Sequence, residues 1–230
     1  MKVLGLVPAR AGSKRLPGKN IKILGDKPLI NWTIEIAKES SAFSDIIVST
    51  DGEAIASIAR DAGANVPWLR PTELASDDAS SVDVAIHALD WYEEFNQSID
   101  ALVLLQPTSP FRTVDTIKRG LQAFEEFKKR TVVSVSLNGS KKTIAFEIEG
   151  DFMYRVQSHA SKFVDVEKSS KLVIPNGVLY VISPNRLRTE RSFFSGEIVP
   201  LFPSSSVEAT DIDTLEDWEM AERIVDIKQS

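Results

Sequence analysis

Val3-Leu4-Gly5-Leu6-Val7 and the loop after it, Pro8-Ala9-Arg10-Ala11-Gly12-Ser13-Lys14-Arg15-Leu16-Pro17-Gly18-Lys19-Asn20, decide the fold of this chain. The first five residues show no polar alternation, which is typical of a strand buried on both faces. Ligands of open α/β sheets bind beyond the carboxyl ends of the strands, so the loop is a candidate anion site. Five cations fall within thirteen residues here: Arg10, Lys14, Arg15, Lys19 and Lys22.

The same alternation continues along the chain. Further apolar runs predict buried strands at residues 46–49, 101–105 and 132–137. Segments with apolar residues at three-to-four spacing predict helices at residues 29–40, 53–62, 81–94 and 114–129. Strands that alternate with helices indicate the α/β class, with a doubly wound and mainly parallel sheet.

From about residue 141 the pattern changes. Residues 143–149, the pair Gly150-Asp151 and residues 152–157 predict a hairpin. Asn176-Gly177 precedes a further apolar run, residues 178–182, and the chain closes with an amphipathic helix predicted at about 214–226. No repeat or linker separates these parts, so we expect one domain over residues 1–230 with a small inserted lobe at about 140–200.

Composition excludes several classes of function. A net charge of −6 and a pI near 5.1 argue against a surface for nucleic acid or anionic membranes. The chain has no cysteine and no apolar run long enough to span a membrane, so we expect a soluble, cytoplasmic protein. The two histidines, His87 and His159, lack metal-ligand spacing and are expected to be packing or surface residues.

The basic loop has a simpler explanation as a solvated loop whose charges only keep the protein soluble. Its place directly after the first strand favours an anion site instead. A P-loop needs four residues between its glycines and then Lys-Ser or Lys-Thr, whereas Gly12 and Gly18 enclose five and Asn20 follows Lys19. The dinucleotide fingerprint G-x-G-x-x-G is absent. The concentration of cations after the first strand thus indicates a triphosphate that is bound by neither of these two loop types.

Residues 8–20 resemble the signature loop of the acylneuraminate cytidylyltransferases, the CMP-sialic acid synthetase family. In the related Kdo cytidylyltransferases the loop typically ends in Gly-Lys-Pro, so Asn20 favours the branch that uses nine-carbon acidic sugars. The resemblance implies the fold of the nucleotide-diphospho-sugar transferases and CTP at this loop, with Arg10 and Lys19 as catalytic residues. The nucleotide contacts that it implies are Ala9, Arg10, Gly12, Ser13, Lys14, Lys19 and Asn20.

A second segment, Gln106-Pro107-Thr108-Ser109-Pro110-Phe111-Arg112, follows the strand predicted at 101–105 and resembles the family's Leu-Gln-Pro-Thr-Ser-Pro segment. Alone it is a proline-bounded turn with Thr and Ser as helix caps. Two family motifs in the same order favour a binding role. The resemblance implies that Gln106 contacts the acidic sugar, with Thr108 in the same substrate-binding set. The planar guanidinium of Arg112 is suited to a second carboxylate anchor.

A third segment, residues 70–81, resembles the family's Arg-Pro…Leu-Ala-x-Asp…Ser segment, which the family assigns to the nucleotide. Arg70 and Ser81 are therefore expected to bind the cytidine or its phosphates. Asp77, Asp78 and the nearby serines have a competing role as the cap of the following helix. For the two aspartates we expect capping.

The fourth segment, residues 211–222, is close to the family's terminal signature. Asp211 and Asp213 stand at alternate positions of an extended segment, so their carboxylates can hold one hard divalent cation. We expect them to bind Mg²⁺ or Mn²⁺, with Asp211 as a catalytic residue. Capping of the helix that follows competes with this role at Asp213.

The half of the chain assigned to the acceptor departs from the family. Leu172-Val173-Ile174-Pro175 stands where family members often place Arg-Gln-Asp, shortly before Asn176-Gly177. The sugar contact supplied by that arginine is missing, which leaves the identity of the sugar open. Tyr180, Phe193 and Phe194 are expected to form an apolar wall for an N-acyl group, although aromatic residues at such positions also occur in cores.

The resemblance implies transfer of CMP from CTP to N-acetylneuraminic, legionaminic or pseudaminic acid, by a homodimer whose lobes cover each other's sites. Two alternatives stay open. A non-catalytic nucleotide-binding module is one, although it has no need of Asp211, Asp213 and Lys19 together. The other is a nucleotidyltransferase for a sugar or polyol phosphate, for which the lobe offers extra cations in Lys141, Lys142, Lys162, Lys168 and Lys171.

Overall fold

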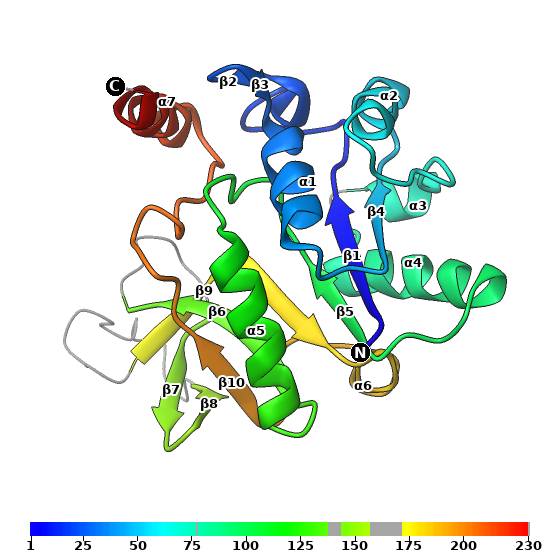
Figure 1. Ribbon diagram of the computed structural model, residues 1–230, viewed down its shortest axis with the longest axis vertical. Helices are drawn as coiled ribbons and strands as arrows, with labels where there is room; N and C mark the ends of the chain where they lie inside the picture. Colours follow the sequence, from blue (N-terminus) through cyan, green and yellow to red (C-terminus); the bar gives the residue numbers. More distant parts are fainter. Residues whose placement is uncertain (77, 138–143, 157–171, 230) are drawn as a thin grey trace.

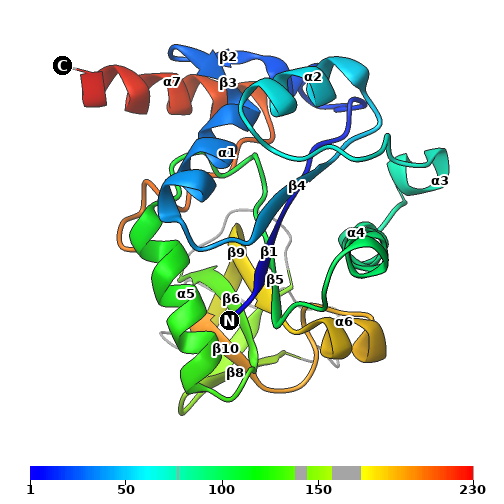
Figure 2. The same ribbon diagram turned by 45° about the vertical axis from the view of Figure 1, so that its right-hand side comes forward.

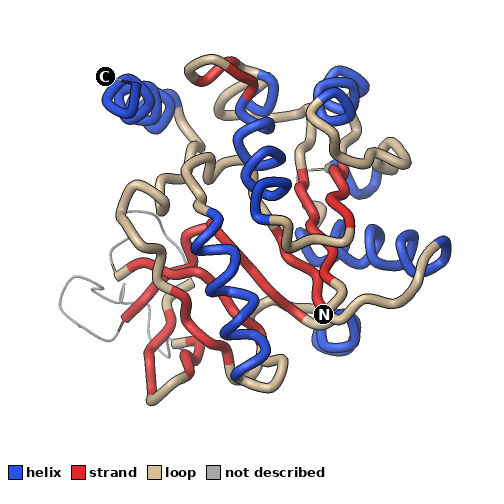
Figure 3. Tube along the Cα trace, viewed as in Figure 1, coloured by secondary structure: helices blue, strands red, loops and turns tan. Residues whose placement is uncertain are grey.

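Figures 1 and 3 show the computed structural model, which describes residues 1–76, 78–137, 144–156 and 172–229. Its strands are β1 (Val3–Pro8), β2 (Ile23–Leu24), β3 (Lys27–Pro28), β4 (Asp45–Ser49), β5 (Ala101–Leu104), β6 (Thr131–Ser136), β7 (Phe146–Glu149), β8 (Phe152–Arg155), β9 (Leu172–Ile182) and β10 (Ile198–Leu201). Eight of them form one sheet in the order β4-β1-β5-β9-β6-β10-β8-β7, and β2 pairs with β3.

Helices cover both faces of the large sheet (Figure 2). They are α1 (Leu29–Ser40), α2 (Glu53–Asp61), α3 (Thr72–Ala75), α4 (Ser81–Phe95), α5 (Val114–Glu126), α6 (Pro184–Glu190) and α7 (Leu215–Gln229), with a short 3-10 turn, η1 (Lys19–Ile21). On one face α1, α2 and α5 bury side chains such as Ile34, Ile55 and Phe124. On the other face α4 and α6 bury Leu89 and Leu187. This is the three-layer α/β architecture that the alternation predicts.

The sheet is mixed, so the prediction of a mainly parallel sheet holds only in part: three of its strand pairings are parallel and five are antiparallel. β1 pairs in parallel with β4 and with β5, and β10 pairs in parallel with β6. β9 lies between β5 and β6 and is antiparallel to both. The parallel strands bring their carboxyl ends, and the loops that follow them, to one edge of the sheet, where α/β folds bind ligands.

The hairpin predicted around Gly150-Asp151 is present as β7 and β8. Gly150 has φ of +60°, the left-handed conformation that suits glycine in a tight turn. β8 pairs with β10 and β7 pairs with β9, so the hairpin extends the main sheet. Of the segment predicted as a lobe, β9 and β10 lie inside this sheet, and residues 138–143 and 157–171 lie outside the described residues.

The last helix forms a smaller core of its own. Trp218, Ala221 and Val225 of α7 pack with Leu24 of β2 and with Phe111. The ammonium of Lys22 lies 3.8 Å from the centroid of the Trp218 ring, a cation–π contact. These contacts hold the start of α7 beside the first loop (Figure 1). Among the described residues no helix is long and apolar enough to cross a bilayer.

Candidate active site

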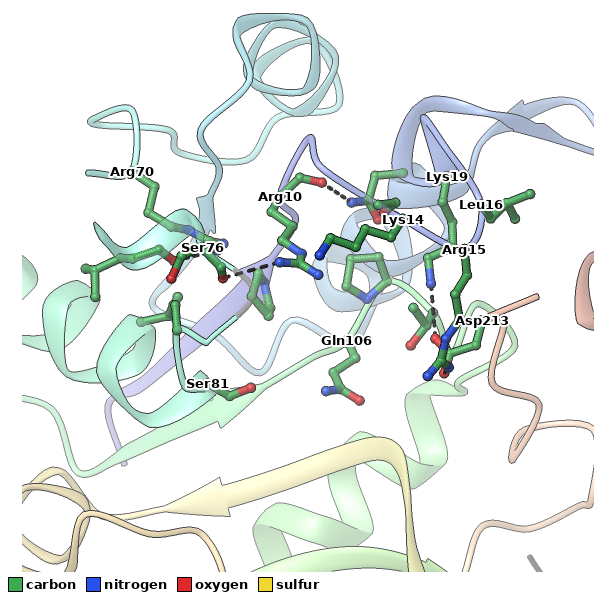
Figure 4. A pocket seen from close by; sticks show the side chains of 18 residues that line it. Arg10, Lys14, Arg15, Leu16, Lys19, Arg70, Ser76, Ser81, Gln106 and Asp213 are labelled. Carbon is green, nitrogen blue, oxygen red and sulfur yellow. Dashed lines mark hydrogen bonds and ion pairs between the residues drawn. The ribbon is translucent and has the colours of Figure 1, made fainter. Parts of the chain in front are cut away.

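A cavity of about 520 Å³ opens at the edge of the sheet where β1 and β5 end (Figure 4). Its walls come from the first loop, from the segment around α3, from the turn after β5 and from the start of α7. Ten of the residues predicted for the site line it: Arg10, Ser13, Lys14, Lys19, Asn20, Arg70, Ser81, Gln106, Thr108 and Asp213. The four sequence motifs therefore meet in one place.

Backbone and side-chain contacts hold the first loop in shape. Asn20 Nδ2 donates to the Arg10 carbonyl at 3.0 Å, so the end of the loop folds back on its beginning. The Ala11 N–H donates to Asp51 Oδ1 at 2.8 Å, and the Ala9 N–H donates to Ser49 O at 2.9 Å. The amide of Ala9 is thus already bonded within the protein, and neither Ala9 nor Gly12 lines the cavity. Their nucleotide contact stays a prediction.

The cations of the loop reach across the cavity to other segments. Arg10 Nη1 donates to the Ser76 carbonyl at 3.2 Å, which joins the loop to the wall beyond α3. Arg15 Nη1 lies 3.3 Å from Asp213 Oδ2, and Lys19 Nζ lies 3.2 Å from Asp213 Oδ1. Figure 4 shows Arg10, Lys14 and Lys19 along the cavity, with Gln106 facing them. Concentrated positive charge at this edge suits a polyphosphate.

Lys19 is the most enclosed of these cations. It is 9% exposed, and its ammonium also donates to the Ile212 carbonyl at 2.6 Å. A buried ammonium is stable only where acceptors replace its water. Lys19 therefore does two things in this structure: it brings positive charge to the cavity and holds the segment that carries Asp213.

Thr214 and Asp217, rather than Asp213, cap the start of α7. The Asp217 N–H donates to Thr214 Oγ1 at 3.3 Å, and Asp217 Oδ2 accepts from the Thr214 N–H at 2.8 Å. This reciprocal pair is a capping box. The competing cap role for Asp213 is thus wrong, and its carboxylate faces the cations of the first loop.

Arg70 lines the cavity, but most of its guanidinium is bonded within the protein. Its Nε donates to Ser49 Oγ at 3.0 Å, its Nη2 donates to the Ser49 carbonyl, and its Nη1 donates to the Leu74 carbonyl at 3.4 Å. Burial lowers its pKa to about 10, and the charge of Asp51 opposes that shift. At neutral pH Arg70 is still a cation, and it braces the wall that Ser76 and Leu74 supply.

Ser80 caps α4, and Ser81 lines the cavity. The Asp83 N–H donates to Ser80 Oγ at 3.1 Å, and Ser80 Oγ donates back to Asp83 Oδ2 at 2.7 Å. The expectation that Asp78 caps this helix is wrong, because Ser80 occupies the capping position. Asp77 lies outside the described residues.

Gln106 lies against a glycine of β9. A Cβ atom added to Gly177 would lie 2.5 Å from Gln106 Oε1 and 3.3 Å from Ser109 Oγ. Gly177 also has φ of +80°, which side-chain-bearing residues rarely adopt. Gly177 of the Asn-Gly pair noted in the sequence therefore supports the site from outside the cavity, because only glycine leaves room for the Gln106 amide.

Arg112 does not line the cavity, which corrects the prediction of a carboxylate anchor. It is 2% exposed, and its three donor groups bond within the protein. Nε donates to Val178 O at 2.5 Å, Nη1 to Thr33 Oγ1 at 3.2 Å and Nη2 to Gln106 O at 3.0 Å. Burial lowers its pKa to about 9, against the attraction of Glu208. Arg112 is a framework residue that ties Gln106 to β9.

Tyr180, Phe193 and Phe194 form one aromatic group. The ring of Tyr180 lies 5.6 Å from that of Phe193 and 5.9 Å from that of Phe194, measured between centroids. Tyr180 and Phe193 are buried, and none of the three lines the cavity. Their role as an apolar wall stays a prediction. Burial raises the pKa of Tyr180, and the charge of Asp211 acts in the same direction.

Three polar or charged residues that line or support the cavity were not predicted as site residues. Arg15 and Ser76 line the cavity, and Asp51 holds the first loop from outside it. Arg15 was noted only as one cation of the cluster, and Ser76 contributes a carbonyl, which no side-chain pattern reveals. Asp51 follows the strand β4 directly, so its place at the carboxyl end of a strand was a usable signal. His87 packs edge-on against Trp68 at 5.0 Å, as expected of a packing residue, while His159 lies outside the described residues.

The layered sheet and the cationic cavity at its carboxyl edge define a nucleotide-binding α/β protein. The sequence family described as cytidylyltransferase matches residues 4–225. The chain belongs to that family, and so to the nucleotidyltransferases.

Curated relatives extend over the full chain. A CMP-N,N'-diacetyllegionaminic acid synthase of Legionella pneumophila is 37% identical, over 100% of this chain and 98% of the relative. A pseudaminic acid cytidylyltransferase of Campylobacter jejuni is 31% identical, over 96% of this chain and 95% of the relative. An N-acylneuraminate cytidylyltransferase of Escherichia coli is 34% identical over 96% of this chain, which spans 51% of that longer relative.

Solved structures agree on the fold. A CMP:2-keto-3-deoxy-manno-octonic acid synthetase complexed with CTP superposes with a TM-score of 0.75 over 99% of this chain and 100% of the other, at 17% identity. A 4-diphosphocytidyl-2C-methyl-D-erythritol synthase from Anaerococcus prevotii gives a TM-score of 0.63 over 98% of each chain, at 14% identity.

Proposed function

We propose that this protein transfers CMP from CTP to a nonulosonic acid and releases pyrophosphate. The observation that carries the proposal is one cavity in which the cations of the first loop face Gln106 and Asp213. The full-length relatives named as legionaminic and pseudaminic acid enzymes supply the substrate class.

The cations define the nucleotide side of the reaction. Arg10, Lys14, Arg15 and Lys19 line the cavity and would bind the triphosphate oxygens of CTP. The sugar's anomeric oxygen would attack the α-phosphorus as the bond from that phosphorus to the β-phosphate oxygen breaks. Held in line, these groups need mainly positioning and charge neutralisation.

Asp213, with Asp211 two residues before it, supplies oxygen ligands for Mg²⁺. Asp213 lines the cavity beside the cations expected to bind the triphosphate, whereas Asp211 does not line it, so the chain would share the metal ion with substrate oxygens. Mg²⁺ is commonly held by one or two carboxylates plus substrate phosphates. When bound, Mg²⁺ would neutralise phosphate charge, while Lys19 and Arg15 hold Asp213 in place. Mn²⁺ would suit the same oxygens.

The acceptor side is assigned to Gln106. Its amide lies across the cavity from the cations, where a sugar hydroxyl or carboxylate would approach the triphosphate (Figure 4). Legionaminic acids are the first acceptors to test, since the relative with that name is 37% identical over the full length. Leu172 and Val173 are buried, so the sugar carboxylate has to find its cation elsewhere in the site.

We also propose a homodimer. Ile144 and Tyr154 are exposed apolar residues of the predicted lobe, and Leu137, just before the lobe, is exposed too. Covering them with a second copy would remove apolar surface from water. Sedimentation velocity at assay concentration should give about twice the mass of one chain, and a monomer that is fully active would exclude the dimer as part of the site.

The test of function is pyrophosphate release with CTP and Mg²⁺ against N-acetylneuraminic, diacetyllegionaminic and pseudaminic acids, with Kdo as the eight-carbon control. ATP, GTP and UTP replace CTP in matched reactions. Release with CTP and one nonulosonic acid is expected, together with a CMP-sugar of the matching mass. Release with a sugar phosphate alone would reject the proposed acceptor class.

Two controls distinguish an effect on the metal ion from an effect on the folded structure. EDTA should abolish turnover, and added Mg²⁺ should restore it. Asp213→Asn should lower kcat by at least about 100-fold, whereas Asp226→Asn, the same change on exposed α7, should act as the wild type. An Asp213→Asn protein with full, Mg²⁺-dependent activity would remove Asp213 from the metal site.

A further inference from the structure

Glu208 is a buried carboxylate that lies outside the cavity. It is 2% exposed, and its Oε2 accepts from Thr116 Oγ1 at 2.5 Å and from Thr113 Oγ1 at 3.1 Å. Neither Glu208 nor the two threonines line the cavity. Burying a carboxylate is unfavourable unless nearby groups compensate for its lost water. A carboxylate buried at this place therefore needs compensating contacts, and its position suggests a role.

The compensation comes from the start of α5. Thr113 caps this helix and Thr116 lies in its first turn, where helix N–H groups favour a negative charge. Glu208 also lies close enough to the fully buried Arg112 to raise the pKa of that guanidinium against burial. Glu208 is thus fastened to an element that is itself packed on the sheet.

The chain after Glu208 leads to the predicted metal residues. Two turn hydrogen bonds, from the Ala209 N–H to Ser206 O and from the Thr210 N–H to Val207 O, hold it at 3.2 Å each. The Ile212 N–H then donates to the Thr108 carbonyl at 2.8 Å. Glu208 and Ile212 therefore fix this segment at two points, and Asp211 lies between them.

The second of these two points, the hydrogen bond from Ile212 to Thr108, lies in the turn after β5 that carries Gln106. Thr108 stands two residues after Gln106, whose carbonyl accepts from Arg112. The hydrogen bond from Ile212 to Thr108 joins the turn with Gln106 to the segment with Asp211 and Asp213, and the charge of Glu208 also acts on the buried Arg112 guanidinium that holds this turn. A shift of Glu208 would change how these two parts of the cavity face each other.

We propose that Glu208 is a positioning residue that sets the metal-binding segment against α5. This rests on the proposed function, because the metal role of Asp211 and Asp213 is proposed there. Glu208 touches no substrate. Its effect passes through residues 209–213, so its loss should weaken Mg²⁺ binding rather than CTP recognition.

The experiment compares the wild type with three single variants and with the double variant Glu208→Gln/Thr116→Val. Glu208→Gln removes the charge with little change in shape, and Thr116→Val removes the donor from the other side of the same contact. Glu125→Gln is the matched control, since it makes the same chemical change at an exposed acid near the other end of α5. Each is measured for the Mg²⁺ concentration that gives half-maximal rate, for kcat and KM with CTP, and for amide exchange across residues 206–213.

Glu208→Gln and Thr116→Val should each raise the half-maximal Mg²⁺ concentration by about ten-fold or more, as loss of groups that orient metal ligands does. KM for CTP at saturating Mg²⁺ should stay within about two-fold. Amide exchange should speed up over 209–213 and not elsewhere. The double variant should be no worse than either single variant, because both break one contact.

Unchanged exchange at 209–213 in both variants would overturn the proposal. Faster exchange spread over the whole chain would overturn it too, since Glu208 would then serve general stability only. If exchange speeds up only over residues 209–213 while the half-maximal Mg²⁺ concentration stays the same, the link between Glu208 and the metal is refuted. If the wild type releases no pyrophosphate from CTP, the proposed function has failed, and Mn²⁺ binding followed by its electron paramagnetic resonance then takes the place of the rate measurement.

Discussion

Gly177 matters because it has no side chain. Its positive φ and the closeness of Gln106 Oε1 are two separate demands for glycine at one residue. Gly177→Ala should therefore strain the backbone by about 1–2 kcal/mol and also push the Gln106 amide away from its place. We expect KM for the acceptor to rise by about ten-fold or more while KM for CTP stays within about two-fold.

Gly150→Ala is the matched control for Gly177→Ala. Gly150 has a φ of +60° in the β7–β8 turn, and no atom lies within 4 Å of an added Cβ. It carries the same backbone strain without the steric clash. If both variants alter acceptor KM equally, or neither does, Gly177 does not act through Gln106.

His87, on α4, makes stability depend on pH. Burial lowers its pKa below the usual value, and Arg70 acts in the same direction, while Asp90 and Glu73 oppose it. The unfolded chain then binds a proton more readily than the folded protein between the two pKa values. His87 therefore makes the free energy of unfolding fall as the pH drops below about 6.5.

His87→Gln should remove that part of the pH dependence. Urea unfolding at about pH 5.5 and pH 7.5 measures it: the wild type should lose stability on acidification, and the variant should lose less. Asp90→Asn removes an attraction for the protonated imidazole, so this variant should lose more stability on acidification than the wild type does. An identical slope in His87→Gln and wild type would contradict the assignment.

At the scale of elements, Arg112 joins three of them. It links the turn after β5 to β9 through Val178 and to α1 through Thr33. Arg112→Met should lower the free energy of unfolding by about 3–5 kcal/mol, because Glu208 and three acceptors lose their buried partner. Urea unfolding of Arg112→Met and of Arg15→Met, which truncates an exposed arginine, gives the comparison. A stable Arg112→Met protein with weakened sugar binding would restore the anchor role.

Local sequence patterns predict the helices and strands well where one face is plainly apolar. Helix α1 begins and ends at the predicted residues, and the first two long strands differ from prediction by one residue at an end. The predicted run at 178–182 misses the first six residues of β9, because Pro175 and Asn176-Gly177 interrupt the apolar pattern. The antiparallel direction of β9 could not be predicted, because a local run of apolar residues does not reveal which strands it pairs with.

The site residues also divide into those that a local sequence pattern predicts and those whose role depends on packing from distant segments. Gln106, Lys19 and Asp213 were found because each follows a strand or precedes a helix in a family motif. Arg112 lies only six residues after Gln106 and was assigned wrongly, since its burial depends on Thr33 and Val178, which are distant in sequence. Sequence order reports which segments approach the site. Whether a side chain there is enclosed is decided by packing from other segments.

For the whole molecule, the cavity is a region of positive charge on an acidic protein. The chain carries −6 overall, yet five cations line this cavity: Arg10, Lys14, Arg15, Lys19 and Arg70. Attraction of CTP should therefore act at short range and weaken as salt screens it. KM for CTP should rise by roughly three-fold or more between about 50 and about 300 mM NaCl at fixed Mg²⁺.

Arg15 offers a check on that salt dependence. Its side chain is 69% exposed at the mouth of the cavity, so Arg15→Gln should flatten the plot of log KM against log salt. Arg223→Gln makes the same charge change on α7, away from the cavity, and should leave the slope as it is. Equal slopes in all three proteins would show that the cavity exerts no attraction beyond direct contact.

The central place of β9 has a consequence for synthesis on the ribosome. β5 and β6 do not pair with each other, because β9 separates them. While the first 171 residues emerge, β5 and β6 each present an open edge that has no partner until residues 172–182 follow. The nascent chain is therefore most exposed to misassembly late in translation. A pause that leaves residues 172–182 inside the ribosome should increase aggregation in the cell more than a pause after they have emerged.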